Sequence, residues 1–331
     1  MSPGESAPTG VLLMTMGDPS STRGVFPFLF RLFSDPAIIR APWFVRYPLS
    51  LYLSLKKLPT MLRRYGAIGG GSPMNGITGR QAEALGDELS RHGRFKVYIA
   101  NRYCRPDTRA AYRRIKADGV ERLIALPMYP QYSTVTTESS FAALRDAIKR
   151  DDHAPSVVWV RGFAADKGYI AALAARIRDA LYSLPEDKRD NAEMLFSAHS
   201  LPREFIMRGD PYVDEIKDTV SAALEVIGPA RARLCFQSRG GGKREWLTPD
   251  TGALLRELAA EGAYAVLVVP VSFVAENVET LYDVEIMYRR LAAGLGIGHF
   301  VRVKCLNDDP AFIKALADIV LERVSSSAAR S

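Results

Sequence analysis

The chain has 331 residues, of which 47% are hydrophobic and 24% are charged, a balance typical of a folded globular protein. This length predicts two domains or one large α/β unit. The net charge of +7 favours an anionic partner, such as an acidic membrane surface or a substrate with carboxylates. Nucleic-acid binding would rest on this charge alone, so we expect no nucleic-acid partner.

The cysteine pattern and the hydropathy argue against other classes. Cys104, Cys235 and Cys305 lie far apart and form no C-x-x-C pair, which disfavours a disulfide framework or a structural zinc site and favours a reducing compartment. The first ten residues lack the pattern of a secretory signal. No stretch reaches the roughly 18 uncharged apolar residues that a membrane span needs. We therefore expect a cytoplasmic protein.

Short apolar runs of strand length alternate with amphipathic stretches along the chain. The expected strands are residues 11–16, 96–100, 122–126, 157–160, 193–197, 232–237 and 265–271. The expected helices include residues 79–92, 108–118, 169–183, 213–226 and 250–261. This alternation predicts parallel sheets that are covered by helices on both faces.

The pattern runs twice, before and after a charged segment at residues 149–155. We therefore expect an α/β fold of two Rossmann-like, doubly wound domains, one spanning residues 1–150 and the other residues 151–305. No sequence repeat demonstrates a duplication. In such sheets ligands bind beyond the carboxyl ends of the strands, so polar residues that follow strands are the candidates for a site.

Residues 42–64 differ from the rest of the chain because aromatic and leucine side chains alternate there with arginine and lysine. This pattern predicts a basic amphipathic segment that could lie on a membrane or line an apolar mouth. The alternative is an ordinary helix that packs on its own domain.

Two groups of polar residues follow expected strands. His199 comes directly after the apolar run at residues 194–198, and its imidazole suits proton abstraction or metal ligation, although a lone histidine can also be structural. Glu276, Glu279, Asp283 and Glu285 lie near an expected helix start, where Glu276 and Glu279 would share a face. These carboxylates either guide a cation or proton, or compensate the helix dipole.

Two glycine runs, at residues 69–71 and 240–242, lack the spacing of nucleotide-binding loops, and Arg244 stands where a P-loop needs Ser or Thr. We interpret both runs as loops where the backbone could approach a flat ligand. Aromatic and basic residues at 102–103 and 129–133 also follow expected strands. They could hold a large conjugated anion, or simply pack in the core.

These segments, in this order, resemble the ferrochelatase family along nearly the whole chain. The most specific block is Leu195-Phe196-Ser197-Ala198-His199-Ser200-Leu201-Pro202. The other matching segments are residues 11–19, 34–36, 70–73, 102–103, 126–133, 136–140, 208–212, 237–239, 246–247, 278–281 and 306–310.

The resemblance implies an enzyme of haem biosynthesis that inserts ferrous iron into protoporphyrin IX and releases two protons. The porphyrin would lie in a cleft between the two domains, and a C-terminal helix within residues 306–331 would pack back on the body. His199 and Glu279 match the catalytic residues and would bind the iron transiently. Residues matched to substrate binding are Met16, Arg102, Tyr103, Tyr129 and Ser133. A methionine at position 16 resembles the branch of the family that uses protoporphyrin, whereas a tyrosine there resembles the branch that uses coproporphyrin.

The chain also departs from the family pattern. Glu276 and Asn277 stand where Asp-His is common, so a second histidine is lost. A Gly-Gly-Gly-Lys stretch follows Arg239 in place of Val-Gly-Pro, and Thr134 replaces a frequent cysteine. Because no cysteine follows Cys305, we expect no iron–sulfur cluster, and no permanently bound cofactor beside the iron substrate.

Other functions remain open at this stage. The chain could be a coproporphyrin III ferrochelatase or another tetrapyrrole chelatase, although the apolar segment at residues 42–64 argues against a highly carboxylated ring. It could also bind porphyrin or haem without catalysis. The expected partners are porphyrin, ferrous iron and, through residues 42–64, the surface of a membrane. The oligomeric state stays open between monomer and homodimer.

Overall fold

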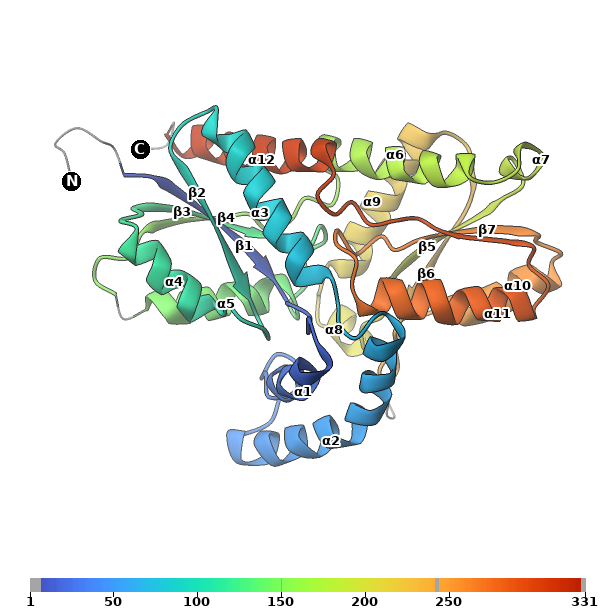
Figure 1. Cartoon of the computed structure of the whole chain (residues 1–331), viewed down its shortest axis with the longest axis horizontal. Helices are drawn as coiled ribbons and strands as arrows, with labels where there is room; N and C mark the ends of the chain where they lie inside the picture. The colour runs from blue at the N-terminus through green and yellow to red at the C-terminus, as the bar shows by residue number, and fades with distance from the viewer. Residues whose placement is uncertain (1–6, 150, 242–243, 329–331) are drawn as a thin grey trace.

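The computed structural model describes residues 7–149, 151–241 and 244–328, which form two four-stranded parallel sheets arranged side by side (Figure 1). The first sheet has the order β2-β1-β3-β4 and the second has the order β6-β5-β7-β8. The strands are β1 (Thr9–Thr15), β2 (Phe95–Asn101), β3 (Arg122–Pro127), β4 (Ser156–Trp159), β5 (Glu193–His199), β6 (Arg231–Gln237), β7 (Ala265–Val269) and β8 (His299–Arg302). The predicted α/β fold with two parallel sheets is confirmed.

The helices fill the connections between the strands. The α-helices are α1 (Val25–Phe33), α2 (Trp43–Ala67), α3 (Met74–Ser90), α4 (Thr108–Ala117), α5 (Thr137–Ile148), α6 (Lys167–Tyr182), α7 (Glu186–Arg189), α8 (Arg203–Met207), α9 (Tyr212–Ile227), α10 (Thr251–Ala260), α11 (Arg289–Gly294) and α12 (Pro310–Ala328). A short 3₁₀ turn, η1 (Thr22–Gly24), precedes α1, and a π-helix, η2 (Glu279–Tyr288), precedes α11.

Local sequence explains where several of these helices begin. Asp107, Asp166 and Asp250 precede α4, α6 and α10, and each carboxylate accepts a hydrogen bond from the backbone N–H three residues later. Such caps satisfy N–H groups that have no partner within the helix. These three helices begin within two residues of the starts that the amphipathic pattern predicted.

The two sheets share one continuous core. Leu13 and Ile124 of the first sheet belong to the same buried cluster as Tyr169, Leu267 and Phe312 from the second half of the chain. The helix α12 packs against both α3 and α6, so the C-terminal segment joins the two halves along one face (Figure 1). Residues 329–331 of that expected segment lie outside the described residues.

The first sheet extends past the expected domain boundary at residue 150. Its edge strand β4 pairs with β3, and Arg122 lies opposite Ser156 in the register. The charged segment at residues 149–155 therefore connects two elements of one sheet rather than two domains. The strand β8 was not predicted, because only Phe300 and Val301 are apolar in its sequence and His299 and Arg302 flank them.

Helices α1 and α2 project away from the first sheet (Figure 1). The first half of α2 exposes large apolar side chains, with Trp43 68%, Phe44 62% and Tyr52 58% exposed. Its last turns are anchored, since Tyr65 is fully buried in a cluster with residues of α1. Among the described helices, none has the length and apolar content to cross a membrane.

Candidate active site

His199 is the last residue of β5, at the carboxyl edge of the second sheet. Its backbone N–H donates to the Ser272 hydroxyl at 3.0 Å, and its carbonyl accepts a hydrogen bond from the Tyr212 hydroxyl at 3.0 Å. The strand end is thus held from two neighbouring segments. The imidazole itself remains accessible, because 36% of the side chain is exposed.

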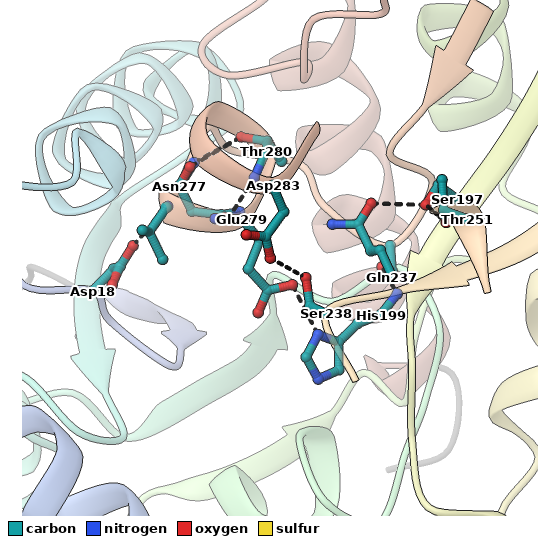
Figure 2. A network of polar contacts seen from close by, with 12 residues as sticks. Asp18, Ser197, His199, Gln237, Ser238, Thr251, Asn277, Glu279, Thr280 and Asp283 are labelled. Atoms are coloured by element: carbon teal, nitrogen blue, oxygen red, sulfur yellow. Dashed lines mark hydrogen bonds and ion pairs between the residues drawn. The ribbon is translucent and has the colours of Figure 1, made fainter. Parts of the chain in front are cut away.

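His199 and Glu279 are in direct contact (Figure 2). Nδ1 of His199 lies 2.8 Å from Oε2 of Glu279, whose side chain is 23% exposed. Burial disfavours charge on both groups, but their mutual attraction and hydrogen bond outweigh it. The pKa of His199 is consequently raised and the pKa of Glu279 is lowered, which favours an ion pair. Within the described residues, no side chain forms a hydrogen bond or ion pair with the other ring nitrogen, Nε2, of His199.

The polar groups around Asn277 fix the start of the π-helix that carries Glu279. The Asn277 side-chain oxygen accepts the backbone N–H groups of Glu279 at 2.8 Å and Thr280 at 3.3 Å. Its amide group donates to the Ala275 carbonyl at 3.0 Å. Asn277 is 5% exposed and caps the helix, so it does not replace the lost histidine as an acid or base. π-helical segments often occur at functional sites.

The acidic patch near His199 is smaller than the sequence predicted. Glu276 precedes the helix and forms a buried ion pair with Arg302 at 2.6 Å. It also accepts the Cys305 backbone N–H at 3.0 Å. Glu285 contacts the same arginine at 3.0 Å. The prediction that Glu276 and Glu279 share a helical face is wrong, because the helix begins only at Glu279.

Asp283 lies one helical turn after Glu279 and is fully buried. Its carboxylate accepts a hydrogen bond from the Ser238 hydroxyl at 2.6 Å and forms an ion pair with Arg64 of α2 (Figure 2 shows the serine contact). Ser238 has a φ of 60°, a left-handed conformation that is uncommon for residues other than glycine. Ser238 also hydrogen-bonds toward Glu279 and helps to lower the pKa of that carboxyl.

The expected substrate-binding residues differ in how accessible they are. Met16 and Tyr129 are half-buried. Arg102 is 26% exposed, and its guanidinium pairs with the buried Asp35 at 2.6 Å. Tyr103 is only 2% exposed and donates its hydroxyl to the same carboxylate at 2.8 Å.

Ser133 is 1% exposed and donates to Asp210 at 2.9 Å. Together with Tyr103, it would therefore act on a substrate only through neighbouring residues.

The two glycine runs approach their own chain. At Gly71 an added Cβ would lie 2.2 Å from the Ser20 carbonyl oxygen, and at Gly240 it would lie 2.5 Å from the Trp246 ring. These contacts explain Gly71 and Gly240 without a flat ligand. Gly242 and Lys243 lie outside the described residues.

A family model, described as ferrochelatase, matches residues 8–324. The chain is 42% identical over 319 residues to a ferrochelatase of Desulfotalea psychrophila, with 96% of this chain and 98% of the relative covered. It is 41% identical over 324 residues to a ferrochelatase of Gloeobacter violaceus, with the same coverage of both chains. The chain belongs to the ferrochelatase family.

The ferrochelatase fold also resembles a solved chelatase. SirB from Bacillus subtilis, solved with Fe3+, matches with a TM-score of 0.56 at 12% identity, and 97% of this chain and 98% of that chain are covered. The sequence prediction of a ferrochelatase, an enzyme of haem biosynthesis, is confirmed by the family. Among the described residues, no three His, Cys, Asp or Glu side chains converge as a metal cluster.

Several residues of this site were not identified from the sequence. Asp18 accepts the Val278 backbone N–H at 3.1 Å, although 260 positions separate the two residues. Ser238 and Arg64 meet Asp283 from two further segments. Asp18 lies within the family-matched segment at residues 11–19, but the sequence gives no sign of its partner.

Proposed function

We propose that this chain inserts ferrous iron into protoporphyrin IX, with His199 and Glu279 as the catalytic pair. The observation that carries this proposal is the 2.8 Å contact between an accessible imidazole and a carboxylate at the carboxyl edge of the second sheet. Both are ligands that iron(II) accepts, and both can take protons.

The reaction replaces two pyrrole N–H protons with one divalent cation. In our proposal, His199 reacts as the neutral imidazole: its Nε2 accepts a pyrrole proton, and the imidazolium that forms is the ion-pair partner of Glu279 through Nδ1. The pyrrole nitrogen keeps the electron pair of its broken N–H bond and donates it to the iron. A second proton leaves by the same route after the first has passed from His199 to solvent. Removing His199 would therefore slow proton removal and iron delivery together.

Met16, Arg102 and Tyr129 are our candidates for contact with the ring. The thioether and the aromatic ring offer apolar surface. The charge of Arg102 is already compensated by Asp35, which leaves little free positive charge for a highly carboxylated substrate. Protoporphyrin IX carries two propionates and coproporphyrin III carries four, so this compensation supports protoporphyrin as the preferred ring.

Anaerobic metalation assays test both assignments. Purified protein is mixed with ferrous iron and either protoporphyrin IX or coproporphyrin III, and loss of the free-porphyrin spectrum is followed. We expect faster turnover with protoporphyrin, and a fall of about 100-fold or more in His199→Ala. His92→Ala serves as the matched control, because His92 is exposed on the surface. Equal turnover of His199→Ala and His92→Ala would refute the catalytic assignment.

The second part of the proposal is that this enzyme is cytoplasmic and contacts a membrane peripherally through the first half of α2. The exposed side chains Trp43, Phe44 and Tyr52 lie on the same helix as exposed Lys56 and Lys57. Aromatic residues beside lysines favour an anionic lipid surface. Such a contact would place the enzyme where an apolar porphyrin partitions.

Liposome flotation with vesicles containing anionic lipid tests this contact. Trp43→Ser with Phe44→Ser should reduce the bound fraction several-fold, since two apolar side chains no longer enter the lipid. Tyr182→Ser is the control, because Tyr182 is 66% exposed on α6 rather than α2. No flotation of the parent protein would refute the membrane contact.

A further inference from the structure

The last turn of α2 is in contact with the π-helix. Arg64, on this turn, forms an ion pair with the buried carboxylate of Asp283. Its guanidinium also lies over the ring of Tyr282, 5.2 Å from the centroid. Asp283 lies four residues after Glu279, so this contact fixes the first turn of the π-helix against the first lobe, the half of the molecule that contains the first sheet.

The next residue of α2 makes a second link to the same helix. Tyr65 is fully buried and donates its hydroxyl to Asp18, in the loop after β1. The other carboxylate oxygen of Asp18 accepts the backbone N–H of Val278, the residue before Glu279, at 3.1 Å (Figure 2). Two consecutive residues of α2 therefore reach the π-helix by separate routes, one to Asp283 and one through Asp18.

We propose that Arg64 and Tyr65 are positioning residues, which clamp the π-helix from the first lobe and hold the Glu279 carboxylate against His199. The inference rests on the proposed catalytic role of Glu279. A reacting group that is displaced by about 1 Å loses much of its effect, so a loosened helix start lowers turnover without weakening porphyrin binding.

Arg64 has an additional, electrostatic effect. Without its charge, the buried carboxylate of Asp283 would have no cationic partner and would stand one turn from Glu279, which pairs with His199. Paired carboxylates attract divalent cations. Arg64 therefore prevents a free cation from binding beside Glu279 before the porphyrin is in place. This effect depends on charge, whereas the positioning effect depends on packing and hydrogen bonds.

Hydrogen exchange tests the clamp directly. We compare Tyr65→Phe with the control Tyr98→Phe. Tyr98 is also buried, but its hydroxyl donates to Asp118 at 2.7 Å, away from the π-helix. Mass spectrometry of a peptide covering residues 273–288 should show about tenfold faster exchange in Tyr65→Phe and parent rates in Tyr98→Phe. Parent rates in Tyr65→Phe would overturn the clamp.

Cobalt(II) titration of the porphyrin-free protein tests the charge of Arg64. Arg64→Met should bind cobalt about tenfold more tightly than the parent. Arg64→Lys, which keeps the charge, and Arg63→Met, which changes the exposed neighbour, should match the parent. Parent affinity in Arg64→Met, or a gain of equal size in Arg63→Met, would overturn the electrostatic effect.

Turnover connects the clamp to catalysis. In Tyr65→Phe we expect kcat to fall about 3- to 10-fold with an unchanged KM for porphyrin, and a parent kcat despite faster exchange would overturn the positioning role. Failure of the proposed function would give a different result. Parent turnover in Glu279→Gln would refute the catalytic role of Glu279. The hydrogen-exchange rates of Tyr65→Phe test the clamp independently of that role.

Discussion

The two sheets of the molecule can be compared position by position, because their strands have the same order. In the first sheet, the Met14 carbonyl accepts the Met128 N–H at 2.9 Å, and in the second the Ser197 carbonyl accepts the Val271 N–H at 3.1 Å. Met16 and His199 each lie two residues after the accepting carbonyl. Met16 in the first sheet therefore corresponds to His199 in the second.

The two positions have different surroundings. His199 is held by Ser272 and Tyr212 and paired with Glu279. Met16 packs against an apolar cluster that includes Tyr103. The second lobe is the half of the molecule that contains the second sheet. The same sheet topology therefore has a polar edge in the second lobe and a largely apolar edge in the first lobe. This difference supports a division in which the first lobe holds the ring and the second performs the proton chemistry.

Among the variants that keep His199, Glu279→Gln should have the largest effect on this division. Loss of the carboxylate charge leaves burial to lower the pKa of His199, which Glu279 raises in the parent. We expect kcat to fall about 10- to 100-fold and the acid limb of the kcat/KM profile to move to lower pH, because His199 then stays neutral at lower pH. An acid limb at the parent pH would contradict the pairing.

Asp18→Asn should alter stability in a pH-dependent way. Burial raises the pKa of Asp18 from 3.8 to about 6, even though hydrogen bonds from Ser72, Tyr65 and Val278 oppose the shift. The folded parent therefore binds this proton more tightly than the unfolded chain, and the resulting stability is complete below pH 3.8 and lost as the pH rises to about 6.

Asparagine does not titrate. Relative to Asp18→Asn, the parent's free energy of unfolding should therefore fall by about 3 kcal/mol between pH 3.5 and pH 7.5. Urea unfolding of both proteins across this range measures the change. A difference between the two proteins that is constant with pH would show that Asp18 is not a buried, uncompensated carboxylate.

Two helix caps should have the smallest effects, and these should be equal. Asp107 caps α4 after β2, and Asp250 caps α10 after β6, so they occupy corresponding places in the two lobes. Asp107→Ala and Asp250→Ala should each lower the free energy of unfolding by about 1 kcal/mol and leave KM for porphyrin unchanged. A much larger cost in one lobe would mean that the two scaffolds are not equivalent.

The sequence allowed prediction of the features that depend on local pattern. The strands β1, β3, β5 and β7 are continuous apolar runs, and His199 stands out because it ends one of them. The resemblance to a family then assigned Glu279, which the alternating pattern alone left as one of four carboxylates.

Contacts between distant segments could not be predicted in this way. Glu276 and Glu285 differ from Glu279 only because Arg302 lies beside them in the folded chain. The π-helix also contacts the first lobe, as in the hydrogen bond of Asp18 with Val278, which joins residues 260 positions apart. The boundary near residue 150 was misplaced because a charged, proline-ended segment has the same appearance whether it joins two domains or two elements of one sheet.

The most direct test of the division between the lobes is single-turnover metalation of pre-bound protoporphyrin IX in His199→Met and Met16→Leu. The porphyrin affinity of each variant is measured separately by fluorescence. We predict that His199→Met binds porphyrin normally but inserts iron at least about 100-fold more slowly, while Met16→Leu inserts iron within a few-fold of the parent rate. Near-parent insertion by His199→Met, or a comparable loss in both variants, would contradict the division between the lobes.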